Sequence, residues 1–130
     1  MNQAFERPFR PVEIADTTVK SFTLSAMADQ LMSEESIEHS GRTSLSLARG
    51  KNMTVVLMVM KEKAVLHEHK APGPITISTL KGHIEFTAQV QSEPLLLQAG
   101  DAAICAPHLP HQVKALEDSA FLLVIGGRTE

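Results

Sequence analysis

Closely spaced histidines are the residues in this sequence with the clearest potential for chemistry. His67 and His69 stand two positions apart, and the stretch from Gly100 to His111 ends in another histidine. In an extended strand successive side chains point to opposite faces, so His67 and His69 are expected on one face, about one ligand-to-ligand distance apart. Such a pair can hold a divalent metal ion, and the downstream stretch supplies the next candidate ligand.

Other catalytic patterns are not found in the sequence. It shows no second acid–base carboxylate, no Ser-His-Asp order and no glycine-rich phosphate loop. Asp101 follows a glycine and is expected to cap a turn. The single cysteine, Cys105, lies in an apolar run and is expected to be a buried, inert thiol, which fits a reducing compartment. An acid–base hydrolase is therefore unsupported, and the catalytic residues stay unknown.

Length, charge and composition limit the classes of protein to which the chain can belong. The chain has 130 residues and a mass of 14.1 kDa, which predicts one domain with its own core. Its net charge is −3 and it has no basic run, so neither nucleic acid nor a membrane surface is an expected partner. The N-terminus has no apolar signal segment, and the longest apolar run, Met53–Met60, is far too short to span a membrane. We therefore expect a cytoplasmic protein.

The first third of the chain predicts an arm and one helix. Residues 1–20 show neither helical nor strand periodicity and are expected to form an arm that pairs with a sheet edge through residues 11–14. Residues 21–37 predict a short amphipathic helix with Ser21 or Ser25 as N-cap. Its methionines are expected to pack on the outside of a sheet. The apolar positions with helical spacing are Leu24, Met27, Ala28, Leu31 and Met32.

From residue 43 onward the pattern predicts β-strands. Turn residues separate the segments at spacings near ten residues, which favours a β-sandwich or a closed barrel. Met53–Met60 is an unbroken apolar run suited to a strand buried on both faces. The cleanest half-buried strand is 84–90, with Ile84, Phe86, Ala88 and Val90 facing inward. The predicted strands are 43–48, 53–60, 64–69, 75–80, 84–90, 95–97, 102–106, 112–116 and 120–125.

These two histidine stretches resemble the motifs of the cupin superfamily, and the resemblance covers roughly residues 45–125. The family pattern opens with His-x-His, as at His67 and His69, and contains a turn glycine that Gly82 matches. Its second motif is Gly-Asp, an apolar strand, a proline-rich turn and a closing histidine, and residues 100–111 match it without gaps. The resemblance implies a small single-domain, RmlC-like cupin.

The implied fold is all-β, a double-stranded β-helix or jelly-roll barrel with a short N-terminal helix. Residues 1–42 would form the arm and helix packed on the barrel, and residues 43–130 the barrel itself. The resemblance also implies a cavity inside the barrel that holds a metal or a small molecule.

The resemblance further implies a set of metal ligands. His67, His69 and His111 would hold a divalent transition metal such as Zn, Fe, Ni or Mn, with His108 as a fourth candidate. The acidic ligand of the family pattern is missing, because Ile75 stands at its position, seven residues before the turn glycine. His108 itself replaces a turn glycine, and Ala115 replaces an asparagine of the pattern.

Two functions stay open at this point. In the first, the metal serves an enzyme, a small-molecule oxygenase or isomerase, and its vacant positions take substrate or oxygen. In the second, a non-catalytic domain binds or senses a small molecule in the same cavity, with a structural metal or none. The named inward positions, including Ile75, Ile77 and Phe86, are apolar, and the chain has no Tyr or Trp. This weighs against demanding acid–base chemistry.

Apolar surface also predicts assembly. Met53–Met60 together with Met27, Leu31 and Met32 offers more apolar surface than one small barrel is expected to cover. We therefore expect a homodimer.

Overall fold

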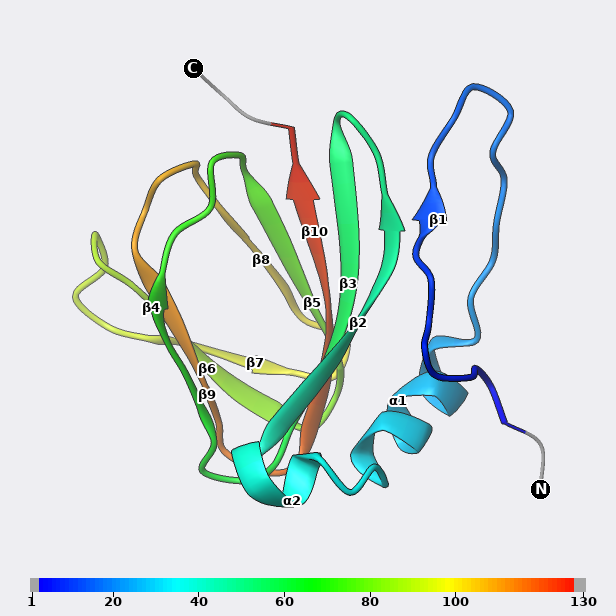
Figure 1. The fold of residues 1–130 in the computed structure, drawn as a ribbon. Coiled ribbons are helices and arrows are strands. Elements are labelled where there is room, and N and C mark those ends of the chain that lie inside the picture. Colours follow the sequence, from blue (N-terminus) through cyan, green and yellow to red (C-terminus); the bar gives the residue numbers. More distant parts are fainter. Residues whose placement is uncertain (1–2, 128–130) are drawn as a thin grey trace.

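A computed structural model describes residues 3–127, which form a jelly-roll barrel of two facing β-sheets (Figure 1). The larger sheet has the strand order β1-β2-β3-β10-β5-β8 and the smaller sheet has the order β4-β9-β6-β7. The strands are β1 (Val12–Glu13), β2 (Arg42–Arg49), β3 (Met53–Met60), β4 (Val65–His69), β5 (Ile75–Lys81), β6 (His83–Ala88), β7 (Leu95–Gln98), β8 (Ala102–Cys105), β9 (His111–Ala115) and β10 (Ser119–Gly126).

The all-β architecture expected from the sequence is confirmed. Every strand predicted from residue 43 onward is present, with ends within two residues of the predicted ones. Two burial predictions are wrong. Val90 is 69% exposed because β6 ends at Ala88 and the chain turns there, with the Gln91 amide donating to the Ala88 carbonyl. Met53 is 41% exposed, so the apolar run of β3 is not buried along its whole length.

Two short helices precede the barrel where one was predicted. Helix α1 (Leu24–Met32) ends five residues before the expected limit, and α2 (Ile37–Ser40) follows it and stops at Gly41, whose φ of 78° suits glycine. The residue before α1 is Thr23, and its side chain makes no capping hydrogen bond, so the predicted serine N-cap is wrong. Among residues 3–127 no helix is long and apolar enough to cross a membrane.

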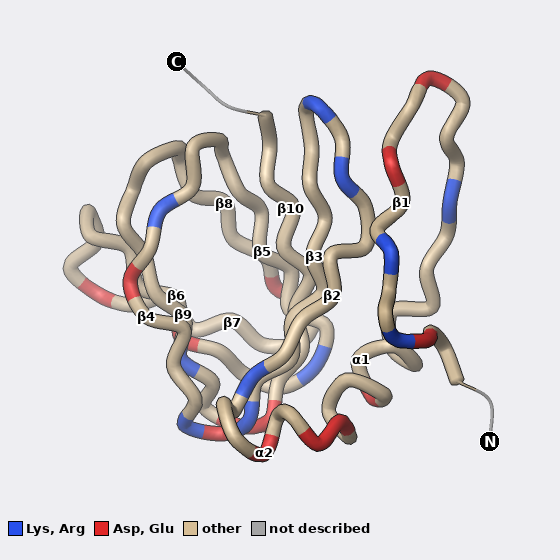
Figure 2. The backbone as a smooth tube through the Cα atoms, viewed as in Figure 1, with Lys and Arg blue, Asp and Glu red and all other residues tan. Residues whose placement is uncertain are grey.

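The larger sheet buries apolar side chains on both of its faces. Its inner face joins the smaller sheet in the barrel core, which contains Met60, Ile77, Phe86 and Phe121 among others. Its outer face is covered by α1, whose buried residues Met27, Ala28 and Leu31 pack with Leu45, Leu47, Leu57 and Val59. The predicted packing of the helix methionines on the outside of a sheet is therefore confirmed. Charged residues lie mainly outside these strands, and β3, β8 and β10 contain none (Figure 2).

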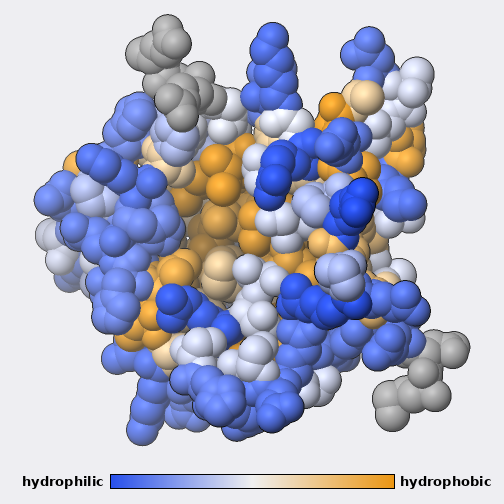
Figure 3. All heavy atoms as spheres, viewed as in Figure 1, coloured by the Kyte–Doolittle hydropathy of each residue, from blue (hydrophilic) through white to orange (hydrophobic). Residues whose placement is uncertain are grey.

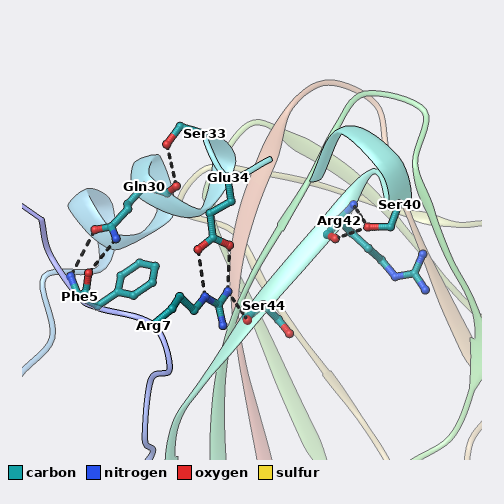
Figure 4. A network of polar contacts seen from close by, with 8 residues as sticks. All are labelled: Phe5, Arg7, Gln30, Ser33, Glu34, Ser40, Arg42 and Ser44. Atoms are coloured by element: carbon teal, nitrogen blue, oxygen red, sulfur yellow. Dashed lines mark hydrogen bonds and ion pairs between the residues drawn. The ribbon is translucent and has the colours of Figure 1, made fainter. Parts of the chain in front are cut away.

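The N-terminal arm is anchored at two levels. As predicted, it pairs with a sheet edge, where Val12 and Glu13 lie parallel to Ala48 and Arg49 of β2. Nearer the terminus, the buried Phe5 is held by Gln30 of α1. The Gln30 Oε1 accepts hydrogen bonds from the amides of residues 4 and 5 at 2.8 and 3.3 Å. Its Nε2 donates to the Phe5 carbonyl at 2.8 Å, and Figure 4 shows the contacts between Gln30 and Phe5.

A bidentate ion pair lies beside this amide clamp. Both Arg7 Nε and Nη2 donate to the Glu34 carboxylate, at 3.0 and 2.9 Å, and Nη2 also reaches the Ser44 carbonyl at 3.4 Å (Figure 4). The Arg7 side chain is 46% exposed, so solvent screens the pair. We infer that the neutral clamp at Gln30 contributes more to arm docking than this ion pair does.

Gln30→Leu should therefore lower the free energy of unfolding by about 1–3 kcal/mol, because backbone donors and an acceptor of the arm lose their partners in a partly buried site. Arg7→Ala should lower it by less than about 1 kcal/mol, as is usual for exposed ion pairs. Urea unfolding of both variants measures the difference. A larger loss in Arg7→Ala than in Gln30→Leu would contradict this ranking.

Candidate metal centre

Two histidines from neighbouring strands of the smaller sheet face each other, His111 buried and His69 exposed. His69 is the last residue of β4, His111 is the first residue of β9, and the two are direct cross-strand partners. Their Nε2 atoms lie 3.1 Å apart and their ring centroids 4.3 Å apart. Antiparallel pairing thus brings together two residues that are 42 positions apart in the sequence.

The third histidine of the expected set is placed differently. Between Leu66 and His69 the register shifts, because three residues of β4 span the length that two residues of β9 span. Such a bulge breaks the alternation of side chains that places residues i and i+2 on one face. His67 is exposed, and its carbonyl oxygen accepts a hydrogen bond from His69 Nδ1. The structure therefore shows two converging imidazoles where three were expected.

His108 lies in the turn before β9. Its φ of 66° places it in the left-handed region that favours glycine, and its amide donates to the Ala71 carbonyl at 2.8 Å. Among residues 3–127 no three His, Cys, Asp or Glu side chains form a group that could hold an ion as they stand. The assignment of His67, His69, His111 and His108 as metal ligands stays a prediction.

The proton positions on the histidine pair follow from their other contacts. His69 Nδ1 lies 3.0 Å from the His67 carbonyl oxygen, and His111 Nδ1 lies 2.9 Å from the Leu109 carbonyl oxygen. A carbonyl oxygen only accepts, so a hydrogen on each Nδ1 satisfies these two contacts. Two neutral rings in that tautomer present their Nε2 lone pairs to each other across 3.1 Å, which is repulsive unless a proton or a metal ion lies between them. In the other tautomer of His69, Nε2 donates to His111 Nε2 and the contact with the His67 carbonyl is given up.

Burial opposes a proton on His111, whereas His69 is exposed to solvent. His111 is 4% exposed, and its ring stacks on Phe86 with centroids 5.4 Å apart and planes 18° apart. Burial lowers the pKa of His111 and the nearby His69 lowers it further, although the Leu109 carbonyl acts in the opposite direction. Cys105 Sγ lies 4.0 Å from His111 Nδ1, and burial raises the pKa of this thiol, so it adds no negative charge. The expected burial of Cys105 is confirmed.

A divalent metal ion fits the donor atoms of the pair. Two metal–nitrogen bonds of about 2.1 Å at a right angle place their nitrogen atoms about 3.0 Å apart. Metal-binding histidines also commonly donate their other ring hydrogen to a backbone carbonyl, which fixes the tautomer. Both features are present at His69 and His111. No carboxylate replaces the missing acidic ligand, because Ile75 is 4% exposed and part of the apolar core.

Comparison with known proteins identifies the fold. No protein-family model and no curated protein sequence matches the chain. Among solved structures, an RmlC-like cupin from Desulfovibrio desulfuricans matches 84% of this chain and 97% of its own, with a TM-score of 0.67 at 20% identity. The chain has the cupin fold.

Two further solved structures have a similar fold. A conserved protein of unknown function from Streptococcus pyogenes matches 95% of this chain and 99% of its own, with a TM-score of 0.69 at 18% identity. The KdgF protein from Halomonas sp. matches 69% and 82%, with a TM-score of 0.61 at 24% identity. The similarity at these identities concerns the fold, so the function of this cupin barrel must be argued from its own side chains.

Some elements of the site could not be read from histidine spacing. The Leu109 and His67 carbonyls set the tautomers, and the ring of Phe86 supports His111. For Phe86 the alternation of side chains along its strand predicted an inward position, and this was the only indication in the sequence that it belongs to the site. Nothing in the sequence indicated the two carbonyls, whose orientation depends on the turn before β9 and on the bulge of β4.

The lowered pKa of His111 predicts a pH-dependent stability in metal-free protein. As pH decreases below the ordinary histidine pKa of about 6.5, this residue takes up a proton in the unfolded chain while burial opposes protonation in the native state. The free energy of unfolding should therefore decrease as pH is lowered, by at most about 1.4 kcal/mol per pH unit from this residue. The fall should continue down to the lowered native pKa. Urea unfolding in EDTA between pH 7.5 and 5 measures it.

His111→Gln should flatten that profile. The titratable neighbours His69 and Cys105 are retained in this variant, so the difference reports on His111 alone. An unchanged slope between pH 6.5 and 5 would show that protonation of His111 does not oppose folding.

Proposed function

We propose that this cupin barrel binds a divalent transition-metal ion through His69 and His111 and holds a small molecule beside it. The observation that carries the proposal is the approach of His69 Nε2 to His111 Nε2, 3.1 Å apart, together with the burial of His111, which opposes its protonation. A divalent cation can bind both nitrogen atoms without adding a proton. Imidazole donors suit Zn, Fe, Ni or Mn, and we propose the ion is one of these.

Further ligand positions belong to His67, His108 or water in this proposal. His67 is two residues from His69, and His108 is three residues from His111, so both lie close along the chain to the converged pair. When bound, the metal would supply Lewis acidity toward donor atoms of the small molecule. The chain itself would orient the two imidazoles through the carbonyls of residues 67 and 109 and would shield His111 from water with Phe86, while the His69 side stays open to solvent.

Whether the domain is an oxygenase, an isomerase or a binding module depends on polar groups near the ion. On the buried side of the pair, His111 stacks on Phe86 of the apolar barrel core. This favours a non-catalytic binding or sensing role as the second candidate. The free, buried thiol of Cys105 supports a reducing compartment, and we propose the cytoplasm.

Metal should stabilise the protein through the histidine pair. Zn or Ni at pH 7.5 binds the native state and not the unfolded chain, so it should raise the melting temperature, with a smaller increment at pH 5.5 where protons compete. His111→Ala and His69→Ala should each abolish most of the increment. Differential scanning fluorimetry with and without metal measures it.

His39→Ala is the matched control, because His39 is exposed on α2 and away from the barrel interior. It should leave the increment unchanged, whereas His67→Ala and His108→Ala should each reduce it partly if those residues are further ligands. A shift that survives in His111→Ala but disappears in His39→Ala would place the ion on the surface.

We also propose that the protein is a homodimer, for a reason that differs from the sequence expectation. Met27 and Leu31 are buried within one chain, so they leave no surplus apolar surface. The support comes from Ile104, which is 83% exposed on β8 and lies in an uncharged cross-strand row with Thr76 and Val124. A two-fold axis brings the same patch of both copies together, and an uncharged patch meets itself without repulsion.

Light scattering at micromolar concentration should give about twice the monomer mass of 14.1 kDa. Ile104→Lys should return the mass to that of a monomer, because it introduces like charges across the axis. Val19→Lys is the control, since Val19 is 95% exposed and lies outside the row. A wild-type protein that is already monomeric would refute the dimer.

A further inference from the structure

We propose that a pocket at the open edge of β2 binds a phosphate group, with the guanidinium of Arg42 as its principal partner. The phosphate is either the free ion or the monoester of a small molecule, and the two sources share the same recognition chemistry. The pocket is separate from the histidine pair, so this inference does not rest on the proposed metal site.

Strand pairing directs the Arg42 side chain to the inner face of β2. Its cross-strand partner is Met60 of the barrel core, and Ser44 lies opposite Met58, which packs against the same core. Cross-strand partners share a face, so Arg42 and Ser44 both face inward, about 7 Å apart along the strand. Figure 1 shows β2 and β4 bordering the opening between the sheets, and Figure 3 shows an apolar depression there with a hydrophilic rim. Both residues belong to the β2 side of this opening.

A pocket of about 310 Å³ lies beside these two residues. No carboxylate lines it, and Met58 is its one apolar side chain. The volume is sufficient for a phosphate group together with part of a larger molecule. The lining residues are Arg7, Ser40, Arg42, Thr43, Ser44 and Met58.

Arg42 contributes a positive charge that the described chain does not neutralise. Among residues 3–127 its guanidinium makes no ion pair and no hydrogen bond, and Figure 4 shows it directed away from the Arg7–Glu34 pair. Arg7, which also lines the pocket, is already bound by both oxygens of the Glu34 carboxylate. Arg42 therefore retains its full charge and all five N–H donors for an anion.

The backbone of β2 adds a donor at the same place. The Lys61 amide donates to the Gly41 carbonyl, so odd-numbered residues face β3 and the N–H of Ser44 faces the open edge. The contact of Arg7 Nη2 with the Ser44 carbonyl agrees with this orientation. Strand β1 covers only residues 48 and 49 of β2, so it leaves the edge at Ser44 open.

The number of donors favours phosphate over carboxylate. The guanidinium fork of Arg42 alone satisfies the two oxygens of a carboxylate. A phosphate has a third terminal oxygen, which can accept from the hydroxyl or the amide of Ser44. The hydroxyl makes no hydrogen bond within the described residues. Because Arg42 and Ser44 are partly exposed, solvent screens the second negative charge of a phosphate.

The test is an NMR titration of the metal-free full chain in EDTA at constant ionic strength. The probes are inorganic phosphate, phenyl phosphate and acetate. Phosphate should produce saturable shifts in the Arg42 Nε–H and Ser44 amide signals, with an affinity about fivefold or more above that of acetate. Tighter binding of phenyl phosphate than of phosphate would identify a monoester as the ligand, and weaker binding would identify the free ion.

Variants of two arginines on the same strand provide the matched control. Arg42→Gln should weaken phosphate binding about tenfold or more, and Arg42→Lys should weaken it less, because lysine keeps the charge and loses the fork. Arg49→Gln changes the net charge by the same amount but lies seven residues away, opposite Glu13 of β1. It should leave the affinity unchanged. A dispersed amide spectrum confirms that each variant is folded.

Three results would overturn the inference. They are acetate binding as tightly as phosphate, an Arg42→Gln variant that binds phosphate like the wild type, and shifts that spread to Arg49 without saturating. None of them bears on the histidine pair, because the titration contains no metal. Loss of metal binding at His69 and His111 would likewise leave the phosphate pocket untouched.

Discussion

The antiparallel pairing of β4 with β9 is the constraint on which the candidate site depends. It sets His69 opposite His111, and each Nδ1 lies within hydrogen-bond distance of a carbonyl two residues earlier in the chain. The two Nε2 atoms then face each other at 3.1 Å. The site is thus a consequence of backbone register and of two carbonyl orientations. No acidic side chain takes part in it.

The larger sheet buries a second set of apolar residues outside the barrel, so a small domain does not depend on the barrel interior alone for its core. Its outer face is sealed by α1 and by the arm, which Gln30 holds through the backbone of Phe5. A complete second core therefore lies outside the barrel. The inner core, which includes Phe121, lies between the two sheets, and Figure 3 shows an apolar depression open to solvent between them. The N-terminal segment thus covers one face of the larger sheet, and the candidate site lies on the other side of that sheet.

Much of this arrangement could be predicted from local patterns. Alternation of apolar residues located the strands, and the apolar spacing of Met27, Ala28 and Leu31 identified the buried face of α1. The prediction failed where an irregularity of one residue mattered. Val90 was expected inside, but β6 ends before it. The predicted single helix ends at Met32, and a separate helix begins at Ile37. Strand and helix ends depend on hydrogen bonds to distant segments, and these leave little trace in a short stretch of sequence.

The sequence alone determined the fold class, the identity of the histidines and the absence of an acidic residue at position 75, since these follow from residue type and periodicity. Only the tertiary structure decided which imidazoles converge. A single extra residue between Leu66 and His69 cancels the two-residue period from which His67 and His69 were expected to share a face. The protonation state of the pair is likewise a tertiary property, because it depends on the carbonyls of residues 67 and 109 and on burial against Phe86, and these meet only when β4, β6 and β9 pair.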